Sequence, residues 1–256
     1  MTLNSNLTKL FKPKSIAVIG VSLSNPFNPA NVVYNKNRHR LSAKTFGVNP
    51  KGGSIYGQKV YPSISEIPEK IELAVISTKA DRVPDVISEC IAKGVSGAVI
   101  ISGGFNESGR EDLEERIKEI SVRNRFPVVG PNCLGIFSPP HADTFFLPSE
   151  RLITIKRGNV SLISQSGGIL VDMMIKLTQE GVGISKAVSI GNKAVLDETA
   201  MLQYFKKDPE TDVIGIYLEG FGSQRGRVFI NEVNSSEKPI VIIKSGKTLF
   251  DLFYIL

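Results

Sequence analysis

The feature that most constrains this chain is a short apolar run that passes through a serine- and glycine-rich turn into a helical pattern. Residues 158–168 read Gly-Asn-Val-Ser-Leu-Ile-Ser-Gln-Ser-Gly-Gly, and apolar residues then recur at helical spacing between Ile169 and Leu177. The pattern predicts a buried strand, a turn and a helix. The first N–H groups of such a helix are unpaired and lie at the positive end of its dipole, so they can bind a phosphate. A serine-capped turn without a ligand explains the same pattern equally well.

The first half of the chain alternates apolar runs with helical patterns. Strands are expected at residues 15–19, 45–48, 72–77, 97–102 and 127–130, and helices at residues 30–36, 81–93 and 111–124. This alternation is typical of a parallel sheet covered by helices on both faces, whose ligands bind at the carboxyl ends of the strands. Because all five strand ends are small or polar, we expect them to build one cleft.

The first two strand ends favour a phosphate over a nicotinamide ribose. Gly20 is followed by Val-Ser-Leu-Ser-Asn, so only the first glycine of the G-x-G-x-x-G fingerprint is present. The second strand ends in Asn-Pro-Lys-Gly-Gly, which places Lys51 where a nicotinamide cofactor would need a carboxylate. Lys51 suits a phosphate, and a solvated lysine in a turn is the alternative interpretation.

A second α/β series follows a segment, residues 139–157, that has the prolines and weak periodicity of a connector. Strands are expected near residues 159–163, 184–190, 212–217 and 239–243, with helices near 168–180, 197–206 and 223–234. We therefore predict a first domain over residues 1–138 and a second over residues 158–256. Glu219 directly follows the third of these strands, where a carboxylate is placed for chemistry, although an exposed loop glutamate is the commoner case.

Composition excludes several classes of function. The net charge of +6 is mild and forms no arginine-rich arm, so nucleic acid is not expected as a partner. No apolar run approaches the roughly 18–20 residues that span a membrane, and residues 1–12 lack the apolar core of a signal peptide. Cys90 and Cys133 are isolated, which favours reduced thiols and a cytoplasmic location. We assign no metal ligands.

Seven short motifs, in order over residues 8–248, resemble the α part of acid–CoA ligases that form a nucleoside triphosphate. This family contains the ADP-forming acetate–CoA ligases and, more distantly, succinyl-CoA synthetase. Each motif is weak alone, whereas seven in the right order are specific. The motifs are residues 14–22 (Lys-Ser-Ile-Ala-Val-Ile-Gly-Val-Ser), 48–52 (Val-Asn-Pro-Lys-Gly), 100–107 (Ile-Ile-Ser-Gly-Gly-Phe-Asn-Glu), 130–135 (Gly-Pro-Asn-Cys-Leu-Gly), 164–168 (Ser-Gln-Ser-Gly-Gly), 188–192 (Val-Ser-Ile-Gly-Asn) and 217–220 (Tyr-Leu-Glu-Gly).

The resemblance implies an α/β fold with a Rossmann-like CoA-binding domain followed by an incomplete flavodoxin-like domain. In the family, a histidine on the second domain carries phosphate between acyl-CoA and a nucleotide held on an ATP-grasp domain. By resemblance, Glu219 is the catalytic carboxylate that orients this histidine. The residues that would bind the phosphate of the phosphohistidine are Ser164, Ser166 and Gly167. Those that would line the cleft for coenzyme A or acyl-CoA are Gly20, Ser22, Lys51, Ser102 and Asn132.

The sequence departs from the family pattern where the phosphorylated histidine is expected. After residues 245–248 (Ser-Gly-Lys-Thr), the family continues to a histidine in a Ser-His-Thr-Gly context, whereas here eight residues follow, seven of them apolar. The two histidines, His39 and His141, match no family position. We therefore expect this chain alone to bind CoA without ligase turnover, an ATP-grasp partner chain being one candidate source of the missing parts.

Two further functions and a role for the last residues complete the expectations. An NAD(P)-binding redox or sensor module is the first alternative. A serine hydrolase built on Ser166 is the second, although the G-x-S-x-G elbow is absent. Exposure of the apolar residues 249–256 would create an aggregation-prone patch, so we expect them to cover an open sheet edge of this chain or of a second copy in a homodimer.

Overall fold

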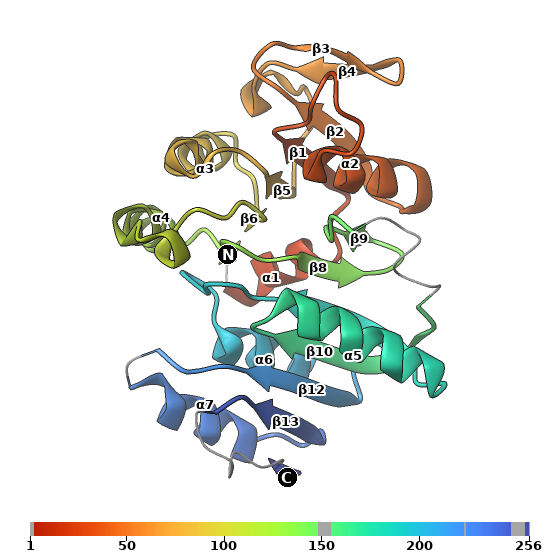
Figure 1. The fold of residues 1–256 in the computed structure, drawn as a ribbon, viewed down its shortest axis with the longest axis vertical. Coiled ribbons are helices and arrows are strands. Elements are labelled where there is room, and N and C mark those ends of the chain that lie inside the picture. Colours follow the sequence, from red (N-terminus) through yellow and green to blue (C-terminus); the bar gives the residue numbers. More distant parts are fainter. Residues whose placement is uncertain (1–2, 148–154, 223, 247–253, 256) are drawn as a thin grey trace.

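The computed structural model describes residues 3–147, 155–222, 224–246 and 254–255, which form two stacked α/β units. In Figure 1 the first sheet and its helices occupy the upper half of the view, and the second sheet, in green to blue, occupies the lower half. Helix α1 (Leu3–Phe11) lies between the two units (Figure 1). Among the described residues, no helix combines the length and the apolar character needed to cross a membrane.

The first sheet has seven strands in the order β3-β4-β2-β1-β5-β6-β7. All neighbours pair in parallel except the β3–β4 hairpin. The strands are β1 (Ser15–Ile19), β2 (Lys44–Val48), β3 (Gly53–Ile55), β4 (Gln58–Tyr61), β5 (Leu73–Ile76), β6 (Gly97–Ile100) and β7 (Val128–Val129). The helices are α2 (Pro29–Arg40), α3 (Val83–Ala92) and α4 (Glu111–Arg123), with single 3₁₀ turns at Ile64–Glu66, Ala80–Arg82 and Asn106–Ser108.

Both faces of this sheet are buried at β1, β5, β6 and β7, which explains why these strands are continuous apolar runs. All five residues of β1 are buried. Ile16 and Val18 pack in the same core as α1 and α2, whereas Ala17 and Ile19 pack in the core under α3 and α4. The period-two alternation of a strand thus supplies both layers.

The second sheet also has seven strands, in the order β14-β13-β12-β10-β11-β8-β9. The central four, β10 to β13, pair in parallel, and β8, β9 and β14 are antiparallel to their neighbours. The strands are β8 (Gly135–Ser138), β9 (Ala142–Asp143), β10 (Arg157–Ser164), β11 (Ile184–Ser189), β12 (Val213–Leu218), β13 (Ile240–Lys244) and β14 (Tyr254–Ile255). The helices are α5 (Gly167–Gln179), α6 (Glu198–Lys207) and α7 (Arg225–Asn234).

The structure corrects the expected connector, because the chain enters the second sheet at Gly135 and not at residue 158. Strands β8 and β9 form a hairpin that pairs with β11. Pro139 and Pro140 lie in its turn, which the N–H of His141 closes by donating to the carbonyl of Ser138 (2.8 Å). The prolines that suggested a connector are therefore turn residues. The domain limits drawn from the sequence remain a prediction, with residues 135–143 reassigned to the second sheet.

The apolar segment at residues 249–256 was expected to cover a sheet edge. Its backbone does so at residues 254–255, where β14 pairs with the edge strand β13. Residues 247–253 and 256 lie outside the described residues, so the rest of that expectation stays a prediction.

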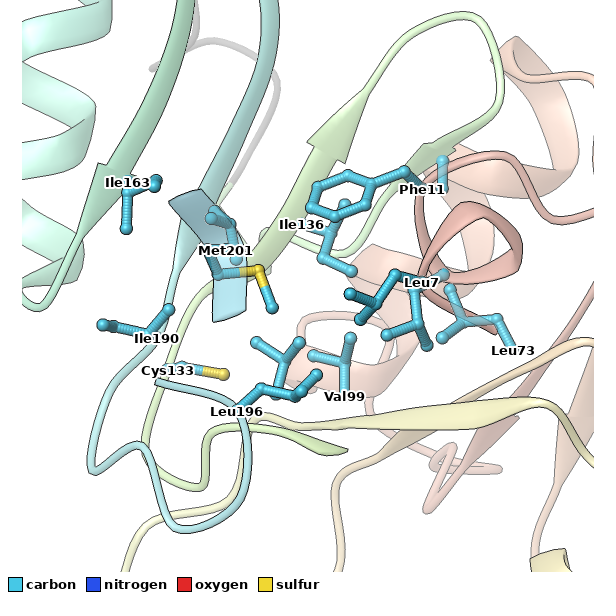
Figure 2. Packing of buried hydrophobic residues seen from close by; sticks show 14 of the residues in the cluster. Leu7, Phe11, Leu73, Val99, Cys133, Ile136, Ile163, Ile190, Leu196 and Met201 are labelled. Atoms are coloured by element: carbon cyan, nitrogen blue, oxygen red, sulfur yellow. The ribbon is translucent and has the colours of Figure 1, made fainter. Parts of the chain in front are cut away.

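Helix α1 joins the two units through one continuous hydrophobic core. Leu7 and Phe11 of α1 lie among Val99 of β6 and Ile136 of β8, with Met201 of α6 close by (Figure 2). The ring of Phe11 also stacks on Tyr204 of α6, with ring centroids 4.7 Å apart. The sequence had not indicated this helix, although its packing holds the two sheets together.

A buried ion network lies where the first unit meets the second. Lys186 of β11 is 1% exposed, and its ammonium group lies 2.7 Å from carboxylate oxygens of both Asp208 and Glu210. Glu210 also binds Lys12, just after α1, at 2.7 Å. The hydrogen bonds from Lys12 and Lys186 lower the pKa of Glu210 from 4.5 to about 2. This network links the end of α1 electrostatically to the second sheet.

Removal of one buried partner should destabilise the fold. We expect Asp208→Asn to lower the free energy of unfolding by about 3 kcal/mol, because it leaves the buried Lys186 charge undercompensated. Asp85→Asn is the matched control, since Asp85 pairs with Arg116 on the surface and such pairs contribute about 0–1 kcal/mol. Denaturant unfolding of both variants gives the comparison, and equal losses would contradict the buried network.

Acid should weaken the same network. The folded pKa of Glu210 lies below its ordinary value, so its contribution to stability is complete above about pH 4.5 and is lost as the pH falls toward 2. Glu210 is partly exposed, so the effect is modest. We expect Glu210→Gln to flatten the fall in unfolding free energy between about pH 5 and pH 2. Glu115→Gln, which alters an exposed pair with Lys118, should leave the slope unchanged, and parallel slopes for all three proteins would refute the assignment.

Candidate functional site

Gly20 lies at the carboxyl end of β1, where the chain must pass very close to its neighbours. Its φ is +102°, and a Cβ at this position would lie 2.1 Å from the carbonyl oxygen of Ser77. Only glycine fits both constraints. The N–H of Gly20 donates to the carbonyl of Val48 at the end of β2 (2.9 Å). Gly20 thus brings the ends of β1, β2 and β5 together.

The loop after β1 is held by a buried asparagine of α2. Asn31 is 1% exposed; its Oδ1 accepts the N–H of Ser22 (2.6 Å), and its Nδ2 donates to the carbonyl of Ser22 (2.8 Å). The Ser22 hydroxyl accepts the N–H groups of Ser24 and Asn25. The loop that carries Ser22 is therefore fixed before any ligand binds.

Lys51 lies exposed in the turn after β2, and this turn is tied to the Ser22 loop. Its N–H donates to Oδ1 of Asn49 (2.9 Å), and Nδ2 of Asn49 donates to the carbonyl of Val21 (2.7 Å). In the described part of the chain, the Lys51 ammonium group has no ion-pair or hydrogen-bond partner. Its charge is therefore available to an anion.

Ser102 and Asn132 connect the first sheet to a second polar region. The Ser102 hydroxyl donates to the carbonyl of Thr78 (2.6 Å), and its own carbonyl accepts the N–H of Asn132 (2.9 Å). Asn132 has a φ of +56°, a conformation that asparagine tolerates better than most residues. Of the five expected CoA residues, Asn132 alone also lines a cleft at the boundary of the two units.

This cleft has a volume of about 680 Å³ and is open and mainly polar. It collects residues from the ends of β6, β7, β10, β11 and β12, so its walls come from both sheets. Among the expected site residues, it brings together Asn132, Ser166, Gly167 and Glu219. The remaining lining residues are Asn106, Glu107, Gln165, Gly191, Asn192, Lys193, Gly220, Phe221 and Gly222.

The amino end of α5 opens into this cleft. Ser166 caps the helix and accepts the N–H of Ile169 (3.5 Å). At Gly167 a Cβ would lie 2.8 Å from Cγ of Leu134, so the helix start packs closely against the first unit's last loop. Ser164 differs from the expectation: it is fully buried, donates its hydroxyl to the carbonyl of Ser166 (2.6 Å), and does not line the cleft. Its position supports the turn rather than a direct contact with phosphate.

Glu219 is exposed at the end of β12 and faces the same cleft. Its N–H donates to Oε1 of Gln165 (3.0 Å), the residue that precedes the Ser166 cap. The same oxygen accepts the N–H of Gly220 (3.3 Å). The turn before α5 and the loop after β12 are thereby joined by one side chain.

Two charged side chains, those of Glu107 and Lys193, accompany Glu219 around the cleft. Partial burial raises the pKa of Glu107, but hydrogen bonds from Asn192 and from the N–H groups of Phe105 and Gly104 outweigh it, so the net shift is downward. Lys193 donates to Glu198 (2.9 Å) and to the carbonyl of Gly220 (2.5 Å). Because Lys193 is already paired, an anion in the cleft would depend mainly on backbone N–H groups at the start of α5.

Among the cleft residues not identified as site residues from the sequence, four have side chains with hydrogen-bond partners: Glu107, Gln165, Asn192 and Lys193. The first three lie inside the family-like motifs, in the loops that follow expected strands, and that position was the available signal. Lys193 follows the motif at residues 188–192 by one position. Cys133 is a core residue whose thiol donates to the carbonyl of Ile100 (3.3 Å), and burial raises the pKa of this thiol.

Comparison with protein families assigns both halves of the chain. Residues 14–139 match the family described as CoA binding domain, and residues 157–250 match the succinyl-CoA ligase like flavodoxin domain. The comparison thus supports the CoA-binding interpretation and does not favour the NAD(P)-binding alternative.

Curated relatives of the chain are acetate–CoA ligases. It is 39% identical over 249 residues to the ADP-forming acetate–CoA ligase II of Archaeoglobus fulgidus, covering 95% of this chain and 36% of that protein. It is 37% identical over 250 residues to the α subunit of acetate–CoA ligase I from Pyrococcus furiosus, covering 95% of this chain and 53% of the subunit. The chain therefore spans about a third to a half of the length of these relatives.

A solved structure confirms the architecture. The apo form of the dinucleotide-forming acetyl-coenzyme A synthetase 1 of Ca. Korarchaeum cryptofilum superposes with a TM-score of 0.87 at 39% identity, over 94% of this chain and 53% of that one. The chain thus consists of a CoA binding domain followed by a succinyl-CoA ligase-like flavodoxin domain, and its homologues are the α-type chains of ADP-forming acetate–CoA ligases.

Proposed function

We propose that this chain is the CoA-binding, phosphate-handling part of an ADP-forming acid–CoA ligase. The complete enzyme would convert acyl-CoA, ADP and phosphate to the acid, CoA and ATP. One observation carries the proposal: hydrogen-bonded loops run from Gly20, Ser22 and Lys51 through Ser102 to Asn132, where the cleft at the start of α5 begins. A long ligand with phosphates at one end and a reactive group at the other suits this path.

Each end of the path has its own chemistry. Gly20 would let the backbone approach the phosphates of CoA, and Ser22 and Lys51 would bind them. Ser102 and Asn132 would guide the thiol end toward the cleft. There, Ser166 and the N–H groups of Gly167 and Gly168 would hold a phosphoryl group at the positive end of the α5 dipole.

Glu219 is proposed as the carboxylate that orients a phosphate-carrying imidazole. Neither His39 nor His141 lies among the residues that line the cleft. We therefore propose that the imidazole, and the ATP-grasp domain that holds the nucleotide, come from outside these 256 residues, for example from a partner chain. We also propose a cytoplasmic location, which would keep both buried free cysteines reduced.

Lys51 should contribute directly to CoA affinity. Calorimetry should show CoA binding to the wild-type protein, and Lys51→Ala should weaken it by about tenfold or more, since a charge-assisted hydrogen bond contributes about 1.5–3 kcal/mol. Lys176→Ala, which removes the same charge from the exposed side of α5, is the control. Unchanged affinity in Lys51→Ala would place CoA elsewhere, and preference for NADPH over CoA would contradict the function itself.

Two substitutions at Ser166 distinguish its role as a helix cap from its proposed role in anion binding. Asp and Asn both cap helices about as well as Ser, so Ser166→Asp and Ser166→Asn should unfold at nearly the same temperature as the wild-type protein. The aspartate would repel an anion at the same place. We expect Ser166→Asp to bind inorganic phosphate about tenfold more weakly than Ser166→Asn, measured by calorimetry. Equal affinities would show that phosphate does not bind at the start of α5.

A further inference from the structure

We propose that Gln165 and Lys193 are positioning residues that hold Glu219 at the cleft, because Gln165 binds the N–H of Gly220 and Lys193 binds its carbonyl. The inference rests on the proposed function, because it gives the cleft carboxylate a fixed place beside the phosphate site.

The first contact comes from the turn before α5. Oε1 of Gln165 accepts two adjacent N–H groups, those of Glu219 (3.0 Å) and Gly220 (3.3 Å). The backbone of Gln165 is itself fixed, because its N–H donates to the carbonyl of Tyr217 in β12 (3.0 Å). The side chain therefore bridges a rigid strand pair to the loop that carries Glu219.

The second contact comes from the loop after β11. The ammonium group of Lys193 donates to the carbonyl of Gly220 (2.5 Å) and to Glu198 (2.9 Å). Glu198 is fully buried, so this pairing fixes where the ammonium group lies. Lys193 has a φ of +50°, an uncommon conformation for lysine that its contacts maintain.

The loop that carries Lys193 is anchored to the first unit. The N–H groups of Asn192, Ala194 and Leu196 donate to carbonyls of Pro131, Gly130 and Val128, at 2.9, 3.1 and 3.2 Å. Glu219 is thus held by one contact from its own sheet and by one that depends on the junction of the two units. These contacts fix the backbone from which the Glu219 side chain extends, and so limit where its carboxylate can lie at the cleft.

Amide hydrogen exchange tests, without any ligand, whether Gln165 and Lys193 hold the backbone of Glu219 and Gly220. Gln165→Met keeps the length of the side chain but removes the acceptor, so the amides of Glu219 and Gly220 should exchange about fivefold faster, as expected for one net hydrogen bond. Gln165→Glu keeps an acceptor and should restore slow exchange. Lys193→Met, made together with Glu198→Gln so that no buried charge is left unpaired, should also speed exchange at Gly220. Unchanged exchange in Gln165→Met would refute the proposal.

Phosphate binding tests the consequence for Glu219. A carboxylate fixed beside the cleft repels phosphate, so Glu219→Gln should bind inorganic phosphate about fivefold more tightly. Gln165→Met should also raise the affinity for phosphate, because it releases the loop that carries Glu219. The double variant Gln165→Met/Glu219→Gln should match Glu219→Gln alone, because both changes weaken the same repulsion between Glu219 and phosphate. Gln165→Glu should weaken binding. A merely structural role would weaken binding in both Gln165 variants, and additive effects in the double variant would also count against positioning.

The control and the two readouts keep the proposals distinguishable. Gln179→Met makes the same change as Gln165→Met at the exposed end of α5, outside the cleft, and it should alter neither measurement. If the wild-type protein binds no phosphate, the proposed function of the cleft fails, and the exchange data still decide whether Gln165 and Lys193 hold the loop that carries Glu219. If phosphate binds but exchange is indifferent to Gln165, the function stands and the positioning inference fails.

Discussion

The candidate site depends above all on the junction between the two sheets. Backbone hydrogen bonds join residues 128–131 of the first unit to the loop after β11, and α1 fills the space between the sheets with Leu7 and Phe11. Neither sheet alone builds the cleft, because Asn132 and Glu107 come from the first and Ser166 and Glu219 from the second. The stability of the junction is therefore a condition for any chemistry there, which connects the buried Lys186 network to function.

The cleft balances attraction and repulsion toward an anion. The start of α5 offers unpaired N–H groups and a positive dipole end. Glu107 and Glu219 are negative, and the nearby Lys193 is committed to Glu198 and Gly220. Such a site would hold a phosphoryl group without binding it irreversibly, a property that suits a group passed between two carriers.

The phosphate end of the proposed CoA path combines a fixed backbone with a free side chain. The Ser22 loop is locked by Asn31 and tied to the Lys51 turn by Asn49. The Lys51 side chain, in contrast, is exposed and has no partner within the described residues. The backbone is thus organised in advance, and only a long cationic side chain must become ordered when an anion arrives, which limits the entropy lost on binding.

The sequence by itself determined the α/β class, the central strands of both sheets and the turn into α5, because fully buried strands leave continuous apolar runs and a glycine turn with serine caps has few alternatives. It also placed Gly20, Lys51 and Ser166 at strand ends. Tertiary structure alone decided which of these ends meet. Asn132 lines the cleft at the boundary of the two units, and Ser164 is buried. Gln165 and Lys193 contact the loop after β12, whose residues lie 27 to 55 positions away in the chain. Helix α1 and the β8–β9 hairpin were missed because a short amphipathic helix and a proline turn carry weak local signals, whereas their positions are set by packing between the two sheets.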